Sequence, residues 1–382
     1  MIFEASRARV SIAGIFLVNG ALLGSWAPQV PFAKERLDLT SAELGGALLA
    51  MAAGAVVSMP LTGMLVARFG SAPVTRAAIL IQLALVPLLA LSPTLALFIL
   101  SLLLFGAANG VCDVAMNSHA VEVEKRLGRP VLSSLHAMFS IGGFLGSAAG
   151  GLALAAVSPA VHLIAVAVVA LVAVAVSQQG LLPSGIDRGA GGHGFALPDR
   201  ALVAIGLLVL VVMMVEGAML DWAAVYLSSE RDASPAVAGA GYAAFSFGMA
   251  AGRLLGDRIR AAVSAPALVR WGGITAAIVL ALAVFGPVES TVLAFAAIGL
   301  AVSNLVPILF AAAGHAPGHT PATGVAAAAT CGYLGFLAGP PLIGFIAEAS
   351  SLGTAFLLLA VGCLVIGFFA RAARTADPAG AA

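Results

Sequence analysis

The sequence predicts an all-α membrane protein in which twelve transmembrane helices form two pseudo-symmetric six-helix bundles. Composition, apolar runs and an internal repeat support this prediction. Of 382 residues, 61% are hydrophobic and only 9% are charged, and the mean hydropathy is +1.09. An average soluble domain carries about 25% charged residues. Most of the surface is therefore expected to face lipid.

Twelve apolar runs have lengths near the ~20 residues that a helix needs to cross a bilayer. They are apolar on all sides and lack the strand-type alternation of an outer-membrane barrel, which predicts lipid-embedded helices. The runs lie at about 10–32, 42–66, 73–92, 95–120, 132–156, 159–180, 201–227, 236–257, 264–286, 290–313, 322–347 and 353–371.

Two sequence echoes divide the chain into halves. GFLGSAAGG at Gly143–Gly151 returns as GYLGFLAGP at Gly332–Pro340, and GALLGSWA at Gly20–Ala27 returns as EGAMLDWA at Glu216–Ala223. The two offsets are nearly equal and close to half the chain length, which indicates duplication of one unit. In so apolar a chain, a repeat of the same orientation is typical of a transporter whose halves rock about a central site.

The longest hydrophilic segment lies at the centre of the chain. It is rich in glycine and contains two prolines, which predicts a connector without regular structure. The predicted domains are an N-terminal bundle at 1–180, a cytoplasmic linker at 181–200 and a C-terminal bundle at 201–382.

The basic residues predict the orientation. Of the 18 Lys and Arg, only Lys34, Arg36 and Arg231 fall on the side of the membrane opposite the termini. Because cytoplasmic loops carry the excess of Lys and Arg, both termini are predicted to be cytoplasmic. The expected setting is a bacterial inner membrane, with the protein as a multi-pass monomer.

Three acidic residues lie inside apolar runs: Asp113 in the fourth, Glu216 and Asp221 in the seventh. Charge inside a bilayer is costly and usually marks an ion, proton or substrate path. Asn109 and Asn117 lie four residues before and after Asp113, so the three share one helix face. For Asn109, a hydrogen-bonded seam between helices is an equally good interpretation.

Further polar residues are candidates for lining a solute site. His136 lies about one turn into the fifth run, at a depth similar to that of Asn117. Asp221 and Trp222 lie nearer the outer surface, where an outer gate or an aromatic belt is expected. The candidates for the opposite wall are Asn19, Tyr242, Asn304 and Tyr333.

Loops after the second and eighth runs carry a further pattern. GMLVARFGSAPVTR and GRLLGDRIR, together with twelve helices in two parallel halves, resemble the major facilitator superfamily. In that family the loop latches the inner gate, although here Ala67 replaces the acidic residue of the first copy. The alternative is that the two arginines only mark topology. The resemblance implies gating roles for Gly63, Arg68, Gly70, Asp257 and Arg258.

Runs four and five carry a more local resemblance. CDVAMN at Cys112–Asn117 and SLHAMFSIGGFLG at Ser134–Gly146 are similar to the fourth and fifth helices of the fucose-permease branch. The match implies that Asp113 is the proton-coupling acid and that Asn117 and His136 occupy positions of solute-binding amides.

The first run lacks the further acidic residue of the fucose permease, so Glu216 is the candidate second proton-coupling acid. The predicted function is a permease, a proton symporter for a small polar solute such as a monosaccharide. No nucleotide-binding motif occurs, and the histidines lack the spacing of metal ligands. No cofactor, metal site, nucleic-acid partner or enzymatic centre is predicted.

The alternative is a proton-antiport exporter of amphipathic compounds or metabolites. It rests on the glycines of run five, Gly142, Gly146, Gly150 and Gly151, which are close to a pattern associated with exporters. Close helix packing explains the same glycines without reference to the direction of transport.

Overall fold

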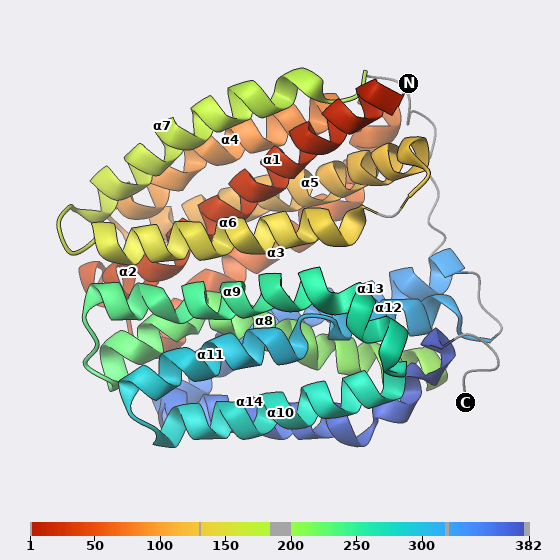
Figure 1. Cartoon of the computed structure of the whole chain (residues 1–382). Helices are drawn as coiled ribbons and strands as arrows, with labels where there is room; N and C mark the ends of the chain where they lie inside the picture. The colour runs from red at the N-terminus through yellow and green to blue at the C-terminus, as the bar shows by residue number, and fades with distance from the viewer. Residues whose placement is uncertain (1, 130, 184–199, 318–320, 378–382) are drawn as a thin grey trace.

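The computed structural model describes residues 2–129, 131–183, 200–317 and 321–377. Its helices form two groups, one from each half of the chain, which lie side by side in Figure 1. Both ends of the chain lie at the same end of the molecule, here called the terminal face; the opposite end is called the distal face.

The first group, within residues 2–183, contains seven α-helices and two short 3₁₀ helices. In chain order they are α1 (Ile2–Trp26), η1 (Ala27–Gln29), α2 (Val30–Arg36), α3 (Ser41–Phe69), α4 (Ser71–Leu91), α5 (Leu95–Leu127), α6 (Leu132–Ala153), α7 (Pro159–Ser177) and η2 (Gln178–Gly180).

The second group, within residues 200–377, contains the remaining helices. They are α8 (Arg200–Glu230), α9 (Pro235–Ala262), α10 (Ala265–Phe285), α11 (Val288–Val302), α12 (Leu305–Gly314), α13 (Pro321–Ala349), α14 (Leu352–Phe368) and η3 (Ala370–Ala376). All twelve predicted runs correspond to helices, with α1, η1 and α2 forming the first run and α11 and α12 the tenth.

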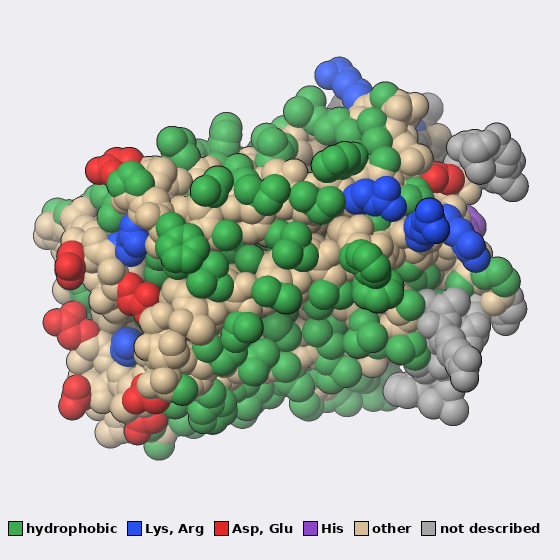
Figure 2. Space-filling model, turned by 90° about the horizontal axis from the view of Figure 1, so that it is seen from below, with side chains coloured by type: hydrophobic (Ala, Val, Ile, Leu, Met, Phe, Trp, Pro, Cys, Tyr) green, Lys and Arg blue, Asp and Glu red, His purple; other side chains and the backbone are tan. Residues whose placement is uncertain are grey.

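Length and hydropathy identify these helices as membrane spans. Ten are long and apolar enough to cross a bilayer within the described residues, and α14 with η3 forms an eleventh, bent candidate. Helix α9, 28 residues long, completes the twelve, although it carries more arginine than the others. Figure 2 shows the apolar belt between two charged ends. The predicted fold class is confirmed.

The repeated glycines lie at matching helix contacts in the two halves. A Cβ atom at Gly24 of α1 would lie 2.8 Å from Cα of Gly143 in α6. In the second half, a Cβ atom at Gly335 of α13 would lie 3.0 Å from the backbone carbon of Leu210 in α8. The glycines therefore allow close approach of helix backbones, which is the packing interpretation of the repeat.

The two groups meet along α6 with α9 and along α3 with α13. The closest approaches lie toward the distal face. A Cβ at Gly239 would lie 2.5 Å from Cα of Gly151, and one at Gly45 would lie 2.6 Å from the carbonyl oxygen of Pro340. The Glu348 carboxylate also accepts a 2.9 Å hydrogen bond from the backbone N–H of Ser41. The structure is therefore closed at the distal face.

Candidate functional site

A buried ion pair lies at the boundary between the two groups of helices. Glu216 is near the middle of α8, and its Oε2 lies 3.8 Å from Nη2 of Arg253 on α9. Nη1 of Arg253 donates a 2.8 Å hydrogen bond to Oγ of Ser140 on α6. The two charged side chains are only 15% and 17% exposed. One guanidinium thus joins α8, α9 and α6.

The contacts of Arg253 were not predicted from the sequence, because the residue was grouped with the cytoplasmic cations. It lies in the motif GRLLGDRIR, which was assigned to the end of the eighth run and the loop after it, but α9 continues to Ala262. Arg253 therefore lies nine residues before the end of the helix, about 14 Å along its axis at ~1.5 Å per residue. The position of Arg253 well inside an apolar run was the signal in the sequence that could have predicted a contact with Glu216.

A tyrosine and a second acidic residue extend this cluster. Tyr242 on α9 is buried, and its ring and the hydroxyl of Ser246 both lie against Gly143 of α6. Asp221, five residues after Glu216 on α8, is 5% exposed, and its Oδ1 has no hydrogen-bond partner among the described residues. The cluster thus contains two carboxylates and one guanidinium in an apolar surrounding, so its hydrogen bonds depend on protonation.

Asp113 lies near the middle of α5, as the sequence predicts. The side-chain amide of Asn117 donates to the backbone oxygen of Asp113 at 2.9 Å and to its carboxylate at 3.2 Å. Asp113 and Asn117 therefore form one local unit on α5.

Asn109 has a different environment from its two companions. Its Oδ1 accepts a 3.1 Å hydrogen bond from Nε2 of the buried Gln82 on α4. The contact lies within the first group of helices, so it has the form of the interhelical seam that was the alternative interpretation.

His136 packs on α1 through its ring. The centroid of its ring lies 5.4 Å from that of Phe16, in an edge-to-face arrangement, and its backbone oxygen accepts a 3.3 Å hydrogen bond from Ser140, the residue to which Arg253 donates. Among the described contacts, no hydrogen bond joins His136 to Asn117. The structure therefore associates His136 with the Arg253 cluster rather than with the stripe on α5.

The other predicted solute-site residues differ in burial and partners. Asn19 on α1 is 1% exposed, and neither polar atom of its amide has a partner among the described residues. Asn304 lies at the break between α11 and α12 and donates to the backbone oxygen of Gly252 at 2.9 Å. Trp222 is wholly buried, so it does not belong to a lipid-facing aromatic belt.

The predicted gating loop forms a tight turn, but the described residues show no ion pair of Arg68 in it. Gly70, with φ of +88°, ends α3 and leads directly into α4. Gly63 and Arg258 are exposed, and the guanidinium of the exposed Arg68 lies 5.1 Å from the ring centroid of Phe69. Arg68 takes part in none of the ion pairs found among the described residues. The side chain of Asp257 lies outside the described ones.

No group of His, Cys, Asp or Glu within the described part of the chain is arranged to hold a metal ion. The polar groups at the boundary between the two halves are the charged side chains of Glu216 and Arg253 and the hydroxyl of Ser140.

Comparisons with known proteins agree with this architecture. The sequence model of the Major Facilitator Superfamily matches residues 12–184. An uncharacterised MFS-type transporter of Yersinia pestis is 40% identical over 95% of this chain and 95% of its own length. The membrane protein MosC of Rhizobium meliloti is 36% identical over 93% of this chain and 88% of its own.

Solved structures share the fold. A point mutant of the nucleoside transporter NupG has a TM-score of 0.78 at 14% identity, covering 96% of this chain and 99% of the other. A D-xylose–proton symporter has a TM-score of 0.74 at 13% identity, covering 97% of both chains. The shared fold is a membrane protein of two helical bundles. By sequence, the chain belongs to the major facilitator superfamily.

Proposed function

We propose that the protein is a proton-coupled secondary transporter that moves a small polar solute, such as a monosaccharide, by alternating access. The buried contact of Arg253 with Glu216 and Ser140 is the observation that carries this proposal. Protonation of Glu216 removes the negative charge that neutralises Arg253 in an apolar surrounding. The guanidinium must then find other acceptors, so the bonds across the α6–α9 boundary depend on the proton.

A second proton-dependent unit supports the proposal. Asp113 and Asn117 form one hydrogen-bonded unit on α5, and Tyr333 of α13 is proposed to supply the opposite wall of the solute path. A solute hydroxyl bound by these groups would meet a different partner when Asp113 is protonated. Coupling requires such a difference in affinity between two states.

These two units divide the predicted site residues into roles. Asp113 and Glu216 exchange protons, while the solute is bound by Asn117, His136, Tyr242, Tyr333 and Asn19. Asn109 and Asn304, whose amides bond within one half, hold helices together. Asp221 and Trp222 act nearer the distal gate. The loop residues Gly63, Arg68, Gly70, Asp257 and Arg258 act at the terminal gate.

The moving units are proposed to be residues 1–180 and 201–382, with 181–200 as their connection. We place the terminal face in the cytoplasm, where Lys and Arg gather in Figure 2, while acidic side chains prevail at the distal end. The proposed setting is a bacterial inner membrane and the active unit a monomer. Both termini are then cytoplasmic.

The test is uptake into proteoliposomes under an imposed pH gradient. A panel of labelled monosaccharides and nucleosides is offered, the second class because a structural neighbour is named as a nucleoside transporter. The expected result is saturable accumulation that a protonophore abolishes and that Asp113→Asn removes while solute exchange continues. Saturable flux independent of the gradient would contradict proton coupling. Flux limited to outward movement of amphipathic compounds would favour the exporter alternative.

A further inference from the structure

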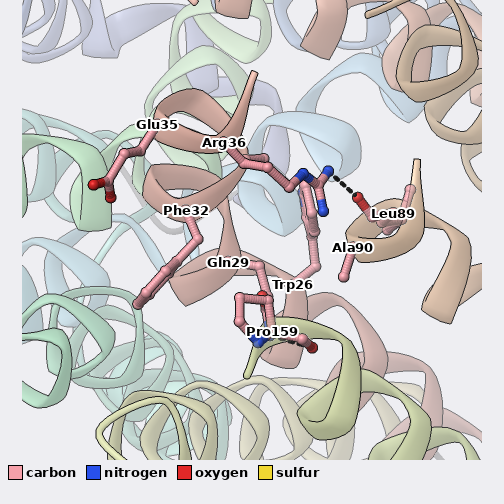
Figure 3. Close-up of a pocket in the computed structure, with 9 residues that line it drawn as sticks. Trp26, Gln29, Phe32, Glu35, Arg36, Leu89, Ala90 and Pro159 are labelled. Atoms are coloured by element: carbon pink, nitrogen blue, oxygen red, sulfur yellow. Dashed lines mark hydrogen bonds between the residues drawn. The ribbon is translucent and has the colours of Figure 1, made fainter. Parts of the chain in front are cut away.

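A pocket lies at the distal face of the first group of helices, away from the acids of the proposed transport site. Its volume is about 350 Å³, and it is bordered by the end of α1, η1, α2, the end of α4 and the start of α7 (Figure 3). Buried side chains form its floor, and the exposed Glu35 and Arg36 stand at its rim. The residues that line it include Trp26, Gln29, Phe32, Glu35, Arg36 and Leu89.

Two side chains that line the pocket each carry a polar atom without a hydrogen-bond partner among the described residues. These atoms are the indole N–H of Trp26 and Oε1 of Gln29, and the two side chains are 0% and 2% exposed. Native proteins leave few buried polar groups without a hydrogen bond, because each one costs roughly 1–3 kcal/mol. A donor and an acceptor without partners in the floor of one pocket point to a bound molecule.

The amide of Gln29 is held in place from behind. Its Nε2 lies 2.6 Å from Nδ1 of the buried His162 and donates to the backbone oxygen of Pro159 at 3.4 Å. These contacts occupy the amide nitrogen and leave Oε1 as the atom available to a ligand. His162 and Pro159 belong to α7, whereas Gln29 belongs to η1. The position of the Gln29 acceptor oxygen is therefore fixed by contacts between η1 and α7.

Arg36 supplies further donors at the rim. Its Nη2 donates a 3.1 Å hydrogen bond to the backbone oxygen of Leu89, which holds the guanidinium against the end of α4 (Figure 3). A guanidinium carries five N–H donors, and this is its one hydrogen bond among the described residues. Glu35, also at the rim, points to the opposite side of α2 and balances the charge.

The charge and hydrogen-bonding groups limit the class of ligand. One cation and one anion at the rim give no net preference for a charged ligand. Indole and guanidinium N–H groups need acceptors, whereas the Gln29 amide oxygen needs a donor. A hydroxyl is both donor and acceptor. The aromatic rings of Trp26 and Phe32 offer apolar walls, and about 350 Å³ is at the small end of ligand pockets.

We propose that this pocket is a binding site for a neutral, ring-sized polyhydroxylated molecule, built by the first group of helices alone. A second pocket of about 420 Å³ shares Phe32 and Glu35 with it and reaches Ser228 and Pro235 of the other half. The bound molecule would therefore lie beside the distal boundary that must part during alternating access. The site does not depend on the proposed transport activity.

The test is calorimetric titration of the purified full-length protein with D-xylose and D-glucose, beside D-glucuronate and glucosamine as charged probes. The measurements use an Asp113→Asn/Glu216→Gln background, so that binding at the transport site is impaired. Binding of the neutral sugars with a stoichiometry near one is expected. Trp26→Phe, which keeps the ring but removes the N–H, and Gln29→Leu are each expected to weaken it at least about tenfold.

Arg36→Gln changes only an exposed rim residue, and is expected to weaken binding several-fold even if the two floor variants fail to fold. Size-exclusion profiles and melting temperatures identify such failures. Sugar binding unaffected by Arg36→Gln and by whichever floor variants fold would overturn the proposal. So would binding of only the charged probes, or the absence of neutral-sugar binding to both the wild-type protein and the background variant.

Discussion

Nη2 of Arg253 lies 3.8 Å from Oε2 of Glu216, and the same guanidinium reaches Ser140 in the other half through a 2.8 Å hydrogen bond. A single side chain thus connects an acid of an apolar helix to the boundary along which the halves are proposed to move. A change in the charge of Glu216 is therefore expected to alter the contact between the two halves.

Removing one partner of this ion pair should be worse than removing both charges. Glu216→Gln leaves a buried arginine without its counter-charge, and loss of one partner of a buried pair costs about 3–5 kcal/mol. We expect the melting temperature to fall in Glu216→Gln and to recover partly in Glu216→Gln/Arg253→Gln. Both variants should lose gradient-driven uptake. Equal melting temperatures for the single and double variants would contradict a stabilising pair.

Asp113 and Asn109 should differ in their effect on transport. Asp113→Asn is expected to abolish accumulation against a gradient while exchange is retained, because only the proton step is lost. Asn109→Ala removes the hydrogen bond to Gln82, so a loss of about 0.5–1.5 kcal/mol in stability with transport retained is expected. Uptake, exchange and thermal melting measured on the same preparations separate the two roles. Full accumulation by Asp113→Asn would exclude it as the coupling acid.

Adjacent glycines in α3 provide a matched pair for testing the distal closure. A Cβ at Gly45 would lie 2.6 Å from the carbonyl oxygen of Pro340, whereas one at Gly46 would meet nothing within 4 Å. Gly45→Ala should force the halves apart at about 1–3 kcal/mol and should favour the distal-open state. Gly46→Ala should leave the conformational equilibrium unchanged. Distances between spin labels at Asp38 and Asp232, both on distal turns, would report the difference.

The hydrogen bond from Ser41 to Glu348 should act as a second distal latch. The Glu348 carboxylate accepts from the first turn of α3, where a negative charge is favoured by the helix dipole. Glu348→Gln should raise the population of the distal-open state about two- to five-fold. Glu289→Gln is the control, because Glu289 is exposed in the first turn of α11 and makes no hydrogen bond among the described contacts. The same spin-label distances measure both, and identical distributions would contradict the latch.

A substitution in the distal pocket should weaken sugar binding there more than it changes uptake. Trp26→Phe should weaken sugar binding at the distal pocket about tenfold or more, because the unpartnered indole N–H is removed while the ring remains. Uptake carried by the central acids should be changed less than binding. Titration and proteoliposome uptake of one variant distinguish the two sites, and parallel loss of both activities would indicate one shared site.

The sequence predicted the membrane fold and the number of spans because each helix in lipid must satisfy its own backbone hydrogen bonds. That requirement leaves long apolar runs that hydropathy detects directly. Asp113 and Glu216 were also visible, because an isolated acid in an apolar run is conspicuous. The glycines of the repeat indicated close packing, but not which helices would meet.

The partners of these groups were decided only by the tertiary structure. Arg253 looked like a loop cation, since nothing in its neighbourhood along the chain points to Glu216 or Ser140, which lie on other helices. The same holds for Gln29 and His162, separated by 133 residues yet 2.6 Å apart. The sequence alone determined that the chain lies in lipid, where its spans lie and that its two halves repeat, because these properties depend on the composition and order of residues along the chain. Which polar groups meet inside the membrane depends on how the helices rotate and pack against one another, and only the folded chain determines this.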